Sequence, residues 1–420
     1  MSLTPEHKES RMYKVDGERL WQSLAAMAEV GPGEAGGSSR LALSEEDRQG
    51  RALFSQWCVA AGLSLTVDPI GNLFARRPGL DDQAAPVVMG SHLDTQPKGG
   101  RFDGVYGVLA GLEVMRSLND ADIQTDRPLE LAVWTNEEGA RFTPAMLGSA
   151  VFTGQLPLAE ALATCDRDGI SVATSLERTG YAGDQPLGRS FDSYFEAHIE
   201  QGPVLEDEGL AVGVVTGGQA ICWLDVCVRG TAAHAGTTPM ARRRDALFGV
   251  GRMLAALEDL AFRFGDGLVT VGQLDVARSS RNTIAGEVRF TLDLRHPQDQ
   301  TLAALETAAR DCLAAVADER GLSLDVQRHW LSPATPFAAD CVGAVREAVQ
   351  ALGYPHRDII SGAGHDAIHL ARHCPTAMIF IPCAGGLSHN EAESASFDDV
   401  RRGADVLFNA VLARAGRQER

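Results

Sequence analysis

Five polar segments of the chain carry histidine or carboxylate side chains. Residues 91–95, 135–139, 196–202 and 387–391 lie beyond apolar runs, and residues 101–104 precede a run with helical spacing. Each side chain alone is typical of an ordinary solvated surface, but the ends of neighbouring strands meet at one edge of a sheet, so we expect these groups to converge. Imidazole and carboxylate together suit zinc, manganese or cobalt, and the set contains no thiolate. The segments therefore predict a metal site at a sheet edge.

Apolar runs and helical patterns alternate around these segments. Residues 86–90, 129–134 and 376–381 are apolar runs typical of buried strands, whereas residues 105–118, 339–352 and 398–415 have apolar residues at helical spacing. This alternation favours an α/β fold, with a central mixed sheet flanked by helices and with polar loops at the strand ends.

The pattern changes character between residues 217 and 333. Strand-like residues 221–228, a helix at 245–264, strands at 268–274 and 287–294, a helix at 300–320 and a strand at 322–329 follow one another. This order is that of a ferredoxin-like α+β domain. We therefore expect a discontinuous catalytic domain, residues 1–216 and 334–420, and an inserted domain at 217–333.

Charge and hydropathy exclude several classes of partner. The chain has 420 residues and a formal net charge of −18, which would repel a phosphate backbone, so we expect no nucleic-acid partner. No run approaches the roughly 20 apolar residues that span a bilayer, and residues 1–14 lack the apolar core of a signal peptide. The eight cysteines are scattered, without a C-x-x-C pair. We expect a cytoplasmic protein with no membrane partner.

Seven short motifs follow one another along nearly the whole chain. They are GSHLDT (90–95), GGRFDG (99–104), NEEGARF (136–142), HIEQG (198–202), AHAGTTPM (233–240), SGAGHDA (361–367) and LSHN (387–390). Together they resemble the amidase, hydantoinase and carbamoylase branch of the M20 metallopeptidase family. This branch includes N-carbamoyl-L-amino-acid hydrolases, allantoate amidohydrolases and beta-ureidopropionases.

The resemblance implies a centre of two divalent metal ions. Asp103 would bridge the ions, and the other ligands would be His92, Glu138, His198 and His389. Asp94, two residues after His92, would accept the other imidazole N–H and fix its tautomer. Zinc is the first expectation for the metal, and the sequence does not distinguish it from manganese, cobalt or nickel.

The resemblance also implies roles in catalysis and substrate binding. Glu137 resembles a general base that takes a proton from metal-activated water and passes it to the departing nitrogen. His234 resembles an imidazole that reaches the active site of the neighbouring subunit, so the inserted domain would be a dimerisation (lid) domain of a homodimer. Substrate contacts are implied at four positions, namely Gln201, Asn282, Arg295 and Gly364. The fork of Arg295 suits a substrate carboxylate.

The expected reaction is metal-dependent hydrolysis of a non-peptide C–N bond in a linear amide, by metal-bound hydroxide. The substrate would be a small carboxylate-bearing molecule, either an N-carbamoyl-L-amino acid or allantoate, between which the sequence does not distinguish. An aminoacylase or dipeptidase on the same scaffold is an alternative, and the Gln-Gly and Thr-Thr-Pro segments favour the carbamoylase branch over it. A catalytically inactive binding protein is a second alternative, which the complete set of ligands and general base disfavours.

Three further histidines could suggest a separate zinc helix. His365, His369 and His373 fall at i, i+4 and i+8, on one face of an expected helix. No strand-end carboxylate is supplied there, and the resemblance places His365 in a loop beside the site. We therefore expect no separate metal at these histidines.

Overall fold

The chain divides into two compact units in the computed structural model, which describes residues 12–278 and 280–417. Unit 1 comprises Met1–Gly217 and Pro336–Arg420, and unit 2 comprises Gly218–Thr335. Residues 1–11, on which most of the expectation about a signal peptide depends, lie outside the described residues. Among the described helices, none has the length and apolar character needed to span a lipid bilayer.

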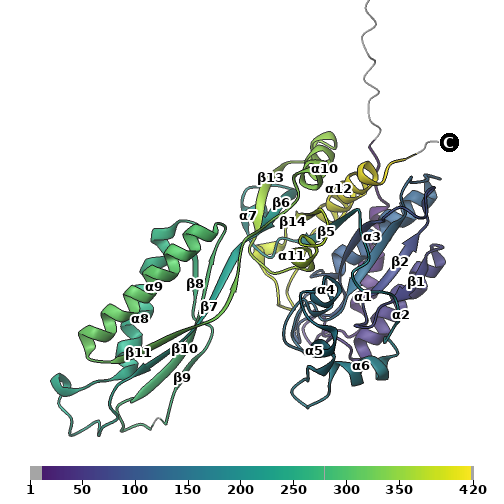
Figure 1. The fold of residues 1–420 in the computed structure, drawn as a ribbon. Helices are drawn as coiled ribbons and strands as arrows, with labels where there is room; N and C mark the ends of the chain where they lie inside the picture. Colours follow the sequence, from purple (N-terminus) through teal and green to yellow (C-terminus); the bar gives the residue numbers. More distant parts are fainter. Residues whose placement is uncertain (1–11, 279, 418–420) are drawn as a thin grey trace, which may run out of the picture. The chain divides into compact units, whose positions relative to one another are not determined.

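A nine-stranded mixed sheet forms the centre of unit 1 (Figure 1). The strands are β1 (Ser64–Val67), β2 (Leu73–Arg77), β3 (Val87–His92), β4 (Leu129–Trp134), β5 (Ser193–Ile199), β6 (Val212–Gly218), β12 (Thr335–Pro336), β13 (His356–Ser361) and β14 (Thr376–Ile381). Their order is β1-β2-β4-β3-β5-β14-β6-β12, and β13 pairs with β6. Strands β4, β3, β5 and β14 run parallel, whereas β2 and β6 are antiparallel to their neighbours in this group.

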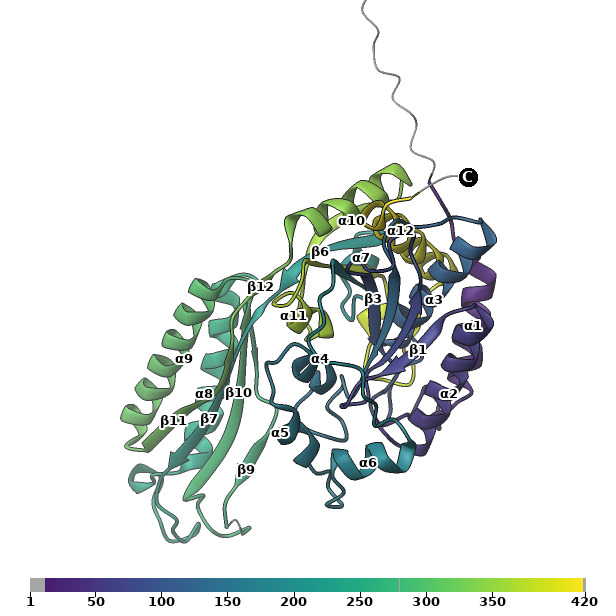
Figure 2. The same ribbon diagram turned by 45° about the vertical axis from the view of Figure 1, so that its right-hand side comes forward.

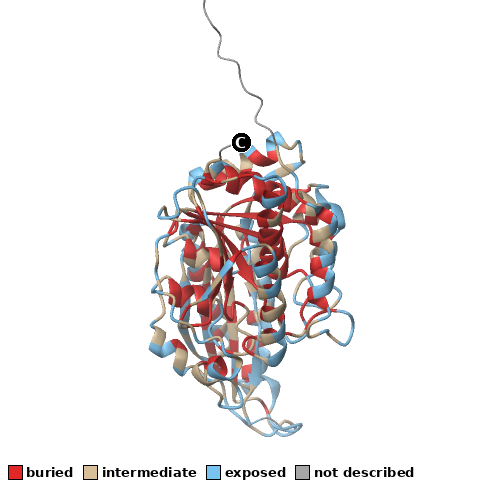
Figure 3. Ribbon diagram, turned by 90° about the vertical axis from the view of Figure 1, so that its right-hand side faces the viewer, coloured by how far each residue is buried: buried red, intermediate tan, exposed pale blue. Residues whose placement is uncertain are grey.

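The four parallel strands are buried along their whole length (Figure 3). Strands covered on both faces read as continuous apolar runs instead of alternating ones, which is the pattern of these segments. The strands predicted at 129–134 and 376–381 are confirmed residue for residue as β4 and β14. Polar side chains enter the runs close to the carboxyl ends, where β3 ends on His92 and β5 contains His198.

Helices flank the sheet of unit 1. They are α1 (Gly17–Ala28), α2 (Glu45–Ala60), α3 (Val105–Asp120), α4 (Leu147–Phe152), α5 (Leu158–Ala163), α6 (Val172–Thr179), α7 (Val204–Asp207), α10 (Ala339–Ala351), α11 (Asp366–Leu370) and α12 (Phe397–Ala415), with a 3₁₀ turn, η3 (Ala384–Gly386). Helices α3 and α12 contact β3 and β5, and α11 contacts β5, β14 and α4 (Figure 2). The expected α/β class, a mixed sheet flanked by helices, is confirmed.

Unit 2 is an α+β domain with one antiparallel sheet. Its elements are β7 (Ala220–Arg229), η1 (Met240–Arg242), α8 (Ala246–Ala261), η2 (Phe262–Phe264), β8 (Leu268–Thr270), β9 (Leu274–Val276), β10 (Glu287–His296), α9 (Asp299–Arg320) and β11 (Ser323–Ser332). The strand order is β11-β7-β10-β8, with β9 also pairing with β10. Every second residue of β7 is buried, because α8 and α9 cover one face of the sheet. The predicted strand at 268–274 is instead two short strands, which Gly272 and its neighbours separate.

Candidate metal centre

The five predicted metal ligands meet at the carboxyl ends of the parallel strands in unit 1. Asp103 Oδ1 lies 3.1 Å from His198 Nε2 and 3.8 Å from His92 Nε2. On the other side of the same carboxylate, His389 Nε2 lies 3.4 Å from Asp103 Oδ2 and 3.3 Å from Glu138 Oε2. A single carboxylate therefore lies among three imidazoles.

Each ligand is placed by the end of an element. His92 and His198 belong to β3 and β5, Glu138 follows β4, and His389 lies in the loop after β14. Asp103 lies just before α3, whose first turn starts at Gly104 with a φ of 66°. A Cβ at Gly104 would overlap the imidazole of His92, so glycine serves both the left-handed backbone and the close approach of the ring.

These side chains form two groups that could each hold a metal ion. His92, Asp103 and His198 form one, and Asp103, Glu138 and His389 form the other, with the ligand atoms of each group within 4.8 Å of one another. Nitrogen and oxygen donors without thiolates are chemically suited to zinc, manganese, cobalt or nickel. Asp103 belongs to both groups, so the donor set fits a pair of ions that share one carboxylate.

The carboxylates of the site are crowded and buried, and this also fits a cation. Burial raises the pKa of Glu138 to about 8, and the nearby charge of Asp103 adds to the rise. Burial raises the pKa of Glu137 well above its usual value, with further contributions from Asp366 and Glu138. Negative charge on these two glutamates is thus unfavourable in this protein environment alone, and a divalent cation among their oxygens would compensate it. Asp103 differs, because its burial is outweighed by its hydrogen bonds with His198 and His389, which hold its pKa well below the usual value.

The two strand-borne histidines have their tautomers fixed by backbone carbonyls. His92 Nδ1 lies 2.8 Å from the carbonyl oxygen of Asp94, and His198 Nδ1 lies 2.9 Å from that of Ile199. A carbonyl can only accept, so each Nδ1 carries the proton and each Nε2 presents the lone pair that a metal ion would bind. The Nε2 of His198 accepts the backbone N–H of Gly104 at 3.2 Å.

Asp94 accepts the other imidazole N–H of His92, as expected, and the structure adds which of its atoms does so. The carbonyl of Asp94, and not its carboxylate, accepts the N–H of His92. The carboxylate instead accepts the backbone N–H groups of Glu137 and Glu138, each at 3.3 Å. These N–H groups lie beyond the last residue of β4, where no neighbouring strand pairs with them. Asp94 thus positions the segment that carries both glutamates.

Glu137 lies beside the site without belonging to either group of ligands. Its Oε2 is 3.4 Å from His92 Nε2, and the residue is only 7% exposed. A carboxylate next to the metal ligands, but outside the ligand groups, is geometrically suited to take and release a proton.

The two predicted substrate contacts in unit 1 have different surroundings. Gln201 Nε2 donates to Asp103 Oδ2 at 3.1 Å and to Ser388 Oγ at 3.0 Å, so this amide contacts the central carboxylate itself. Gly364 is exposed and directly precedes the buried His365. A Cβ at Gly364 would lie 3.1 Å from Cε of Met146, so the space beside it is limited.

His365, which the resemblance placed beside the site, and Glu196 both lie next to His198, although neither was given a predicted role. The ring centroids of His365 and His198 are 4.5 Å apart, and His365 Nε2 is buried without a hydrogen-bond partner among the described residues. Glu196, His198 and His365 form a third close group, so His365 has a carboxylate beside it from within β5, which the expectation of no strand-end carboxylate there did not include. The missed signal was the spacing in β5, because residues two apart in a strand point to the same face.

The third group differs from the other two in how its carboxylate is used. Both oxygens of Glu196 already accept hydrogen bonds, from Ser91 Oγ, Tyr194 Oη and the backbone N–H of Ala367. The expected helix through His365, His369 and His373 is shorter, because α11 ends at Leu370, before His373.

In unit 2, His234 and Asn282 are neighbours. The N–H of Ala235 donates to the carbonyl of Asn282 at 2.9 Å, and His234 forms a bridge with Thr283. His234 Nδ1 accepts the backbone N–H groups of Gly236 and Thr237, at 3.1 and 3.2 Å. The neutral imidazole therefore carries its proton on Nε2, which makes the exposed side of the ring a hydrogen-bond donor.

Arg295 lies away from that pair within the same unit. At about 3.4 Å per residue, Arg295 lies roughly 27 Å along β10 from Glu287, and Glu287 is at the end of β10 nearer to Asn282. Its guanidinium group forms an ion pair with Asp293 of the same strand, at 2.7 Å. The structure thus brings His234 and Asn282 together, but it does not bring Arg295 to them.

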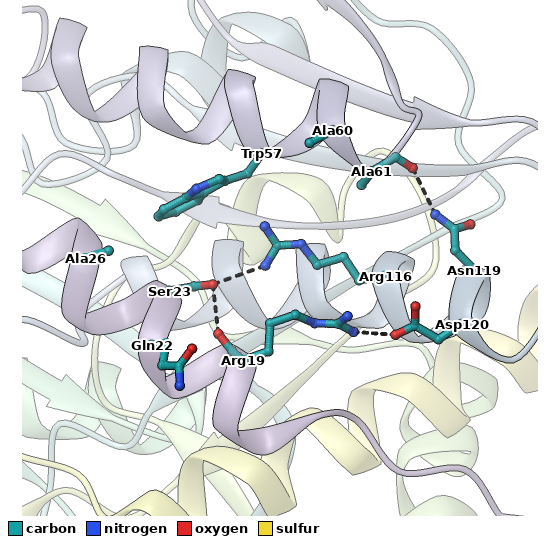
Figure 4. A pocket seen from close by; sticks show the side chains of 10 residues that line it. All are labelled: Arg19, Gln22, Ser23, Ala26, Trp57, Ala60, Ala61, Arg116, Asn119 and Asp120. Atoms are coloured by element: carbon teal, nitrogen blue, oxygen red, sulfur yellow. Dashed lines mark hydrogen bonds and ion pairs between the residues drawn. The ribbon is translucent and has the colours of Figure 1, made fainter.

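A surface hollow of about 530 Å³ between α1, α2 and α3 is chemically different from the metal centre (Figure 4). Arg19 forms ion pairs there with Asp120 and with the buried Glu113, and Arg116 donates to Ser23. Its lining contains no imidazole, and the guanidinium charges are matched by carboxylates, so this hollow is not a candidate for the chemistry.

Known proteins resemble this chain along nearly its whole length. Residues 88–413 match Peptidase family M20/M25/M40. An N-carbamoyl-L-amino-acid amidohydrolase from Rhizobium meliloti is 46% identical over 404 residues, which cover 96% of this chain and 97% of the relative. The allantoate amidohydrolase of Escherichia coli (strain K12) is 32% identical, with 93% and 96% covered. The crystal structure of a hydantoinase/carbamoylase family amidase from Burkholderia ambifaria has a TM-score of 0.93 and 58% identity, with 98% and 100% covered.

The fold, the site and these relatives together define a hydrolase. The chain belongs to Peptidase family M20/M25/M40, and the resemblance expected from the sequence motifs is confirmed.

Proposed function

We propose that this protein hydrolyses the carbamoyl C–N bond of an N-carbamoyl-L-amino acid, with two divalent metal ions, zinc first among them. The observation that carries the proposal is the carboxylate of Asp103, shared between two groups of possible ligands. The choice of substrate is supported by the 46% identical relative, whose name specifies N-carbamoyl-L-amino acids. Allantoate is the second candidate, because a relative named for it is 32% identical over nearly the whole chain.

The side chains of unit 1 divide the work between holding the ions and moving a proton. His92, Asp103 and His198 would hold one ion, and Asp103, Glu138 and His389 the other. When bound, two such ions lower the pKa of a water molecule and polarise the substrate carbonyl. Glu137 takes the proton of the attacking water and delivers it to the departing nitrogen. Asp94 keeps Glu137 and Glu138 in place through their backbone N–H groups.

The side chains of unit 2 bind the substrate in a homodimer, with unit 2 as the dimerisation (lid) domain. His234 donates from Nε2 to the oxyanion, and Asn282 and Arg295 hold the substrate carboxylate. An amino-acid derivative cannot reach both ends of β10, which are roughly 27 Å apart, so one active site needs Arg295 from one subunit and His234 with Asn282 from the other. Gln201 and Gly364 would line the remainder of the site, and the enzyme would work in the cytoplasm.

Turnover of a substrate panel by the zinc-reconstituted protein tests this reaction. We expect N-carbamoyl-L-amino acids to be hydrolysed with the highest kcat/KM, allantoate more slowly, and N-acetyl amino acids and dipeptides least. Release of ammonia or of the free amino acid measures each rate. If only dipeptides or N-acetyl amino acids are hydrolysed, the protein is a dipeptidase or an aminoacylase instead. If no substrate is hydrolysed while metal is bound, the protein is a catalytically inactive binding protein.

Metal ions alone should stabilise the folded protein. An ion that binds only the folded state adds about 2.7 kcal/mol when its free concentration is one hundred times its Kd, so zinc should raise the thermal midpoint by several degrees. The rise should shrink as the pH falls towards about 5, because protons compete for the imidazole and carboxylate ligands. Scanning fluorimetry of chelator-treated protein measures both effects. An unchanged midpoint with zinc, manganese, cobalt and nickel would contradict the metal centre.

A further inference from the structure

One buried carboxylate, that of Glu393, joins the loop that carries His389 to the loop that carries Asp103. Glu393 is only 2% exposed. Its Oε1 accepts the backbone N–H groups of Phe102 and Asp103, at 2.9 and 3.1 Å, and its Oε2 accepts from Ser388 Oγ at 3.0 Å. Both oxygens are thus used as hydrogen-bond acceptors, and neither belongs to a group of possible metal ligands.

Ser388 extends this connection to the central carboxylate. Its Oγ lies 3.2 Å from Asp103 Oδ2, and it accepts from Gln201 Nε2 at 3.0 Å. Glu393 therefore contacts Asp103 twice, directly at the backbone and through Ser388 at the side chain. The next residue after Ser388 is the predicted ligand His389. The contacts of Ser388 therefore also fix the position of the His389 backbone, from which the imidazole extends.

His389 has little other support. Its side chain is 53% exposed, whereas His92 and His198 lie in buried strands. Its φ of 53° is in the left-handed region, and Gly385 and Gly386 shortly before it also have positive φ. A ligand on such a loop keeps its position only through the contacts that hold the loop.

The space around Glu393 matches this role. A Cβ at Gly100 would overlap the Glu393 carboxylate, so the chain passes this point only because residue 100 has no side chain. The φ of Gly100 lies outside the region that favours glycine. Glycine is therefore needed at residue 100 because the three atoms nearest to an added Cβ are those of the Glu393 carboxylate.

We propose that Glu393 is a positioning residue that sets the separation of Asp103 and His389, and thereby the metal affinity of the group formed by Asp103, Glu138 and His389. This role rests on the metal centre of the proposed function. Loss of a side chain that holds a ligand in place typically weakens metal binding by 10–100-fold. The group of His92, Asp103 and His198 should change less, because two of its three ligands belong to the sheet.

The test is titration of the full-length, metal-free protein with zinc by calorimetry, and with cobalt by its visible absorption. The wild-type protein should bind two ions. In Glu393→Ala the second ion should bind about 10–100-fold more weakly while the first is retained. Glu393→Gln should keep both affinities, because an amide oxygen still accepts the two backbone N–H groups. The matched control is Glu391→Ala, which removes a half-buried carboxylate of the same loop that accepts the backbone N–H of Ala35, and it should bind as the wild type does.

A second variant keeps the proposal testable if Glu393→Ala does not fold. Gly100→Ala leaves the carboxylate present but displaces it, and it should also weaken the second ion, whereas Gly343→Ala, where a Cβ meets no atom within 4 Å, should not. If both Glu393→Ala and Gly100→Ala bind the second ion with wild-type affinity, the role of Glu393 is overturned and the two-metal centre is not. An equal loss of metal affinity in Glu393→Gln would also overturn the positioning role, because the negative charge of Glu393, and not its hydrogen bonds, would then determine the affinity. A wild-type protein that binds fewer than two ions would overturn the two-metal centre itself.

Discussion

The Glu137→Gln variant should keep its metal ions and lose nearly all of its turnover. Glutamine has the shape of glutamate but cannot take a proton, and general acid–base catalysis contributes about 10²- to 10⁴-fold to a rate, so we expect kcat to fall by that factor. Glu137 lies outside both groups of possible ligands, so two ions per chain should remain. Steady-state kinetics and elemental analysis of the same preparation measure the two quantities.

The neighbouring glutamate provides the control for this experiment. Glu138→Gln removes a side chain of the second group and should reduce the metal content as well as the rate, whereas Glu137→Gln should reduce the rate alone. Both residues receive the same support from Asp94, so a general loss of structure at this strand end would affect the two variants equally. If Glu137→Gln lost metal in the same way as Glu138→Gln, Glu137 would be a ligand and not the general base.

Long buried strands were the part of the fold that the sequence predicted best. Strands β4 and β14 are mostly apolar runs between polar loops, with Glu130 as the one charged residue in them, so both of their ends were visible. The short helices α4, α5 and α6 were not predicted, because six to eight residues contain too few turns for a periodic pattern. Their positions depend on packing against the rest of unit 1, which a local pattern does not contain.

The candidate site was predictable in its residue types and less so in its contacts. The position of His92 and Glu138 at strand ends predicted that they would meet, because parallel strands place their carboxyl ends together. Which atom of Asp94 accepts the His92 N–H depends on how the chain turns after β3, so the sequence predicted the residue and not the atom. Glu393 gave no signal, since a glutamate in a polar loop is ordinary until its burial is known.

Mixed dimers should recover activity from two inactive variants. His234→Ala lacks the proposed oxyanion donor and Glu137→Gln lacks the general base, so each homodimer should be nearly inactive. In a heterodimer, the site with an intact Glu137 receives the intact His234 of the other subunit, while the opposite site lacks both groups. One of the two sites is then complete, and we expect about half of the wild-type activity per dimer. Two different affinity tags on co-expressed chains allow the heterodimer to be purified.

The recovery depends on the proposal that Glu137 and His234 of one active site belong to different subunits, and the separation of unit 2 residues along β10 supports a shared site. His234 and Asn282 lie near one end of the sheet and Arg295 near the other, too far apart to contact the same small substrate. The control is a heterodimer of Glu137→Gln with Glu138→Gln, in which both sites of unit 1 are damaged, and it should stay inactive despite two intact His234 residues. If the His234→Ala heterodimer is equally inactive, His234 does not act across subunits. If no heterodimer is recovered from the two tags, the homodimer itself is contradicted.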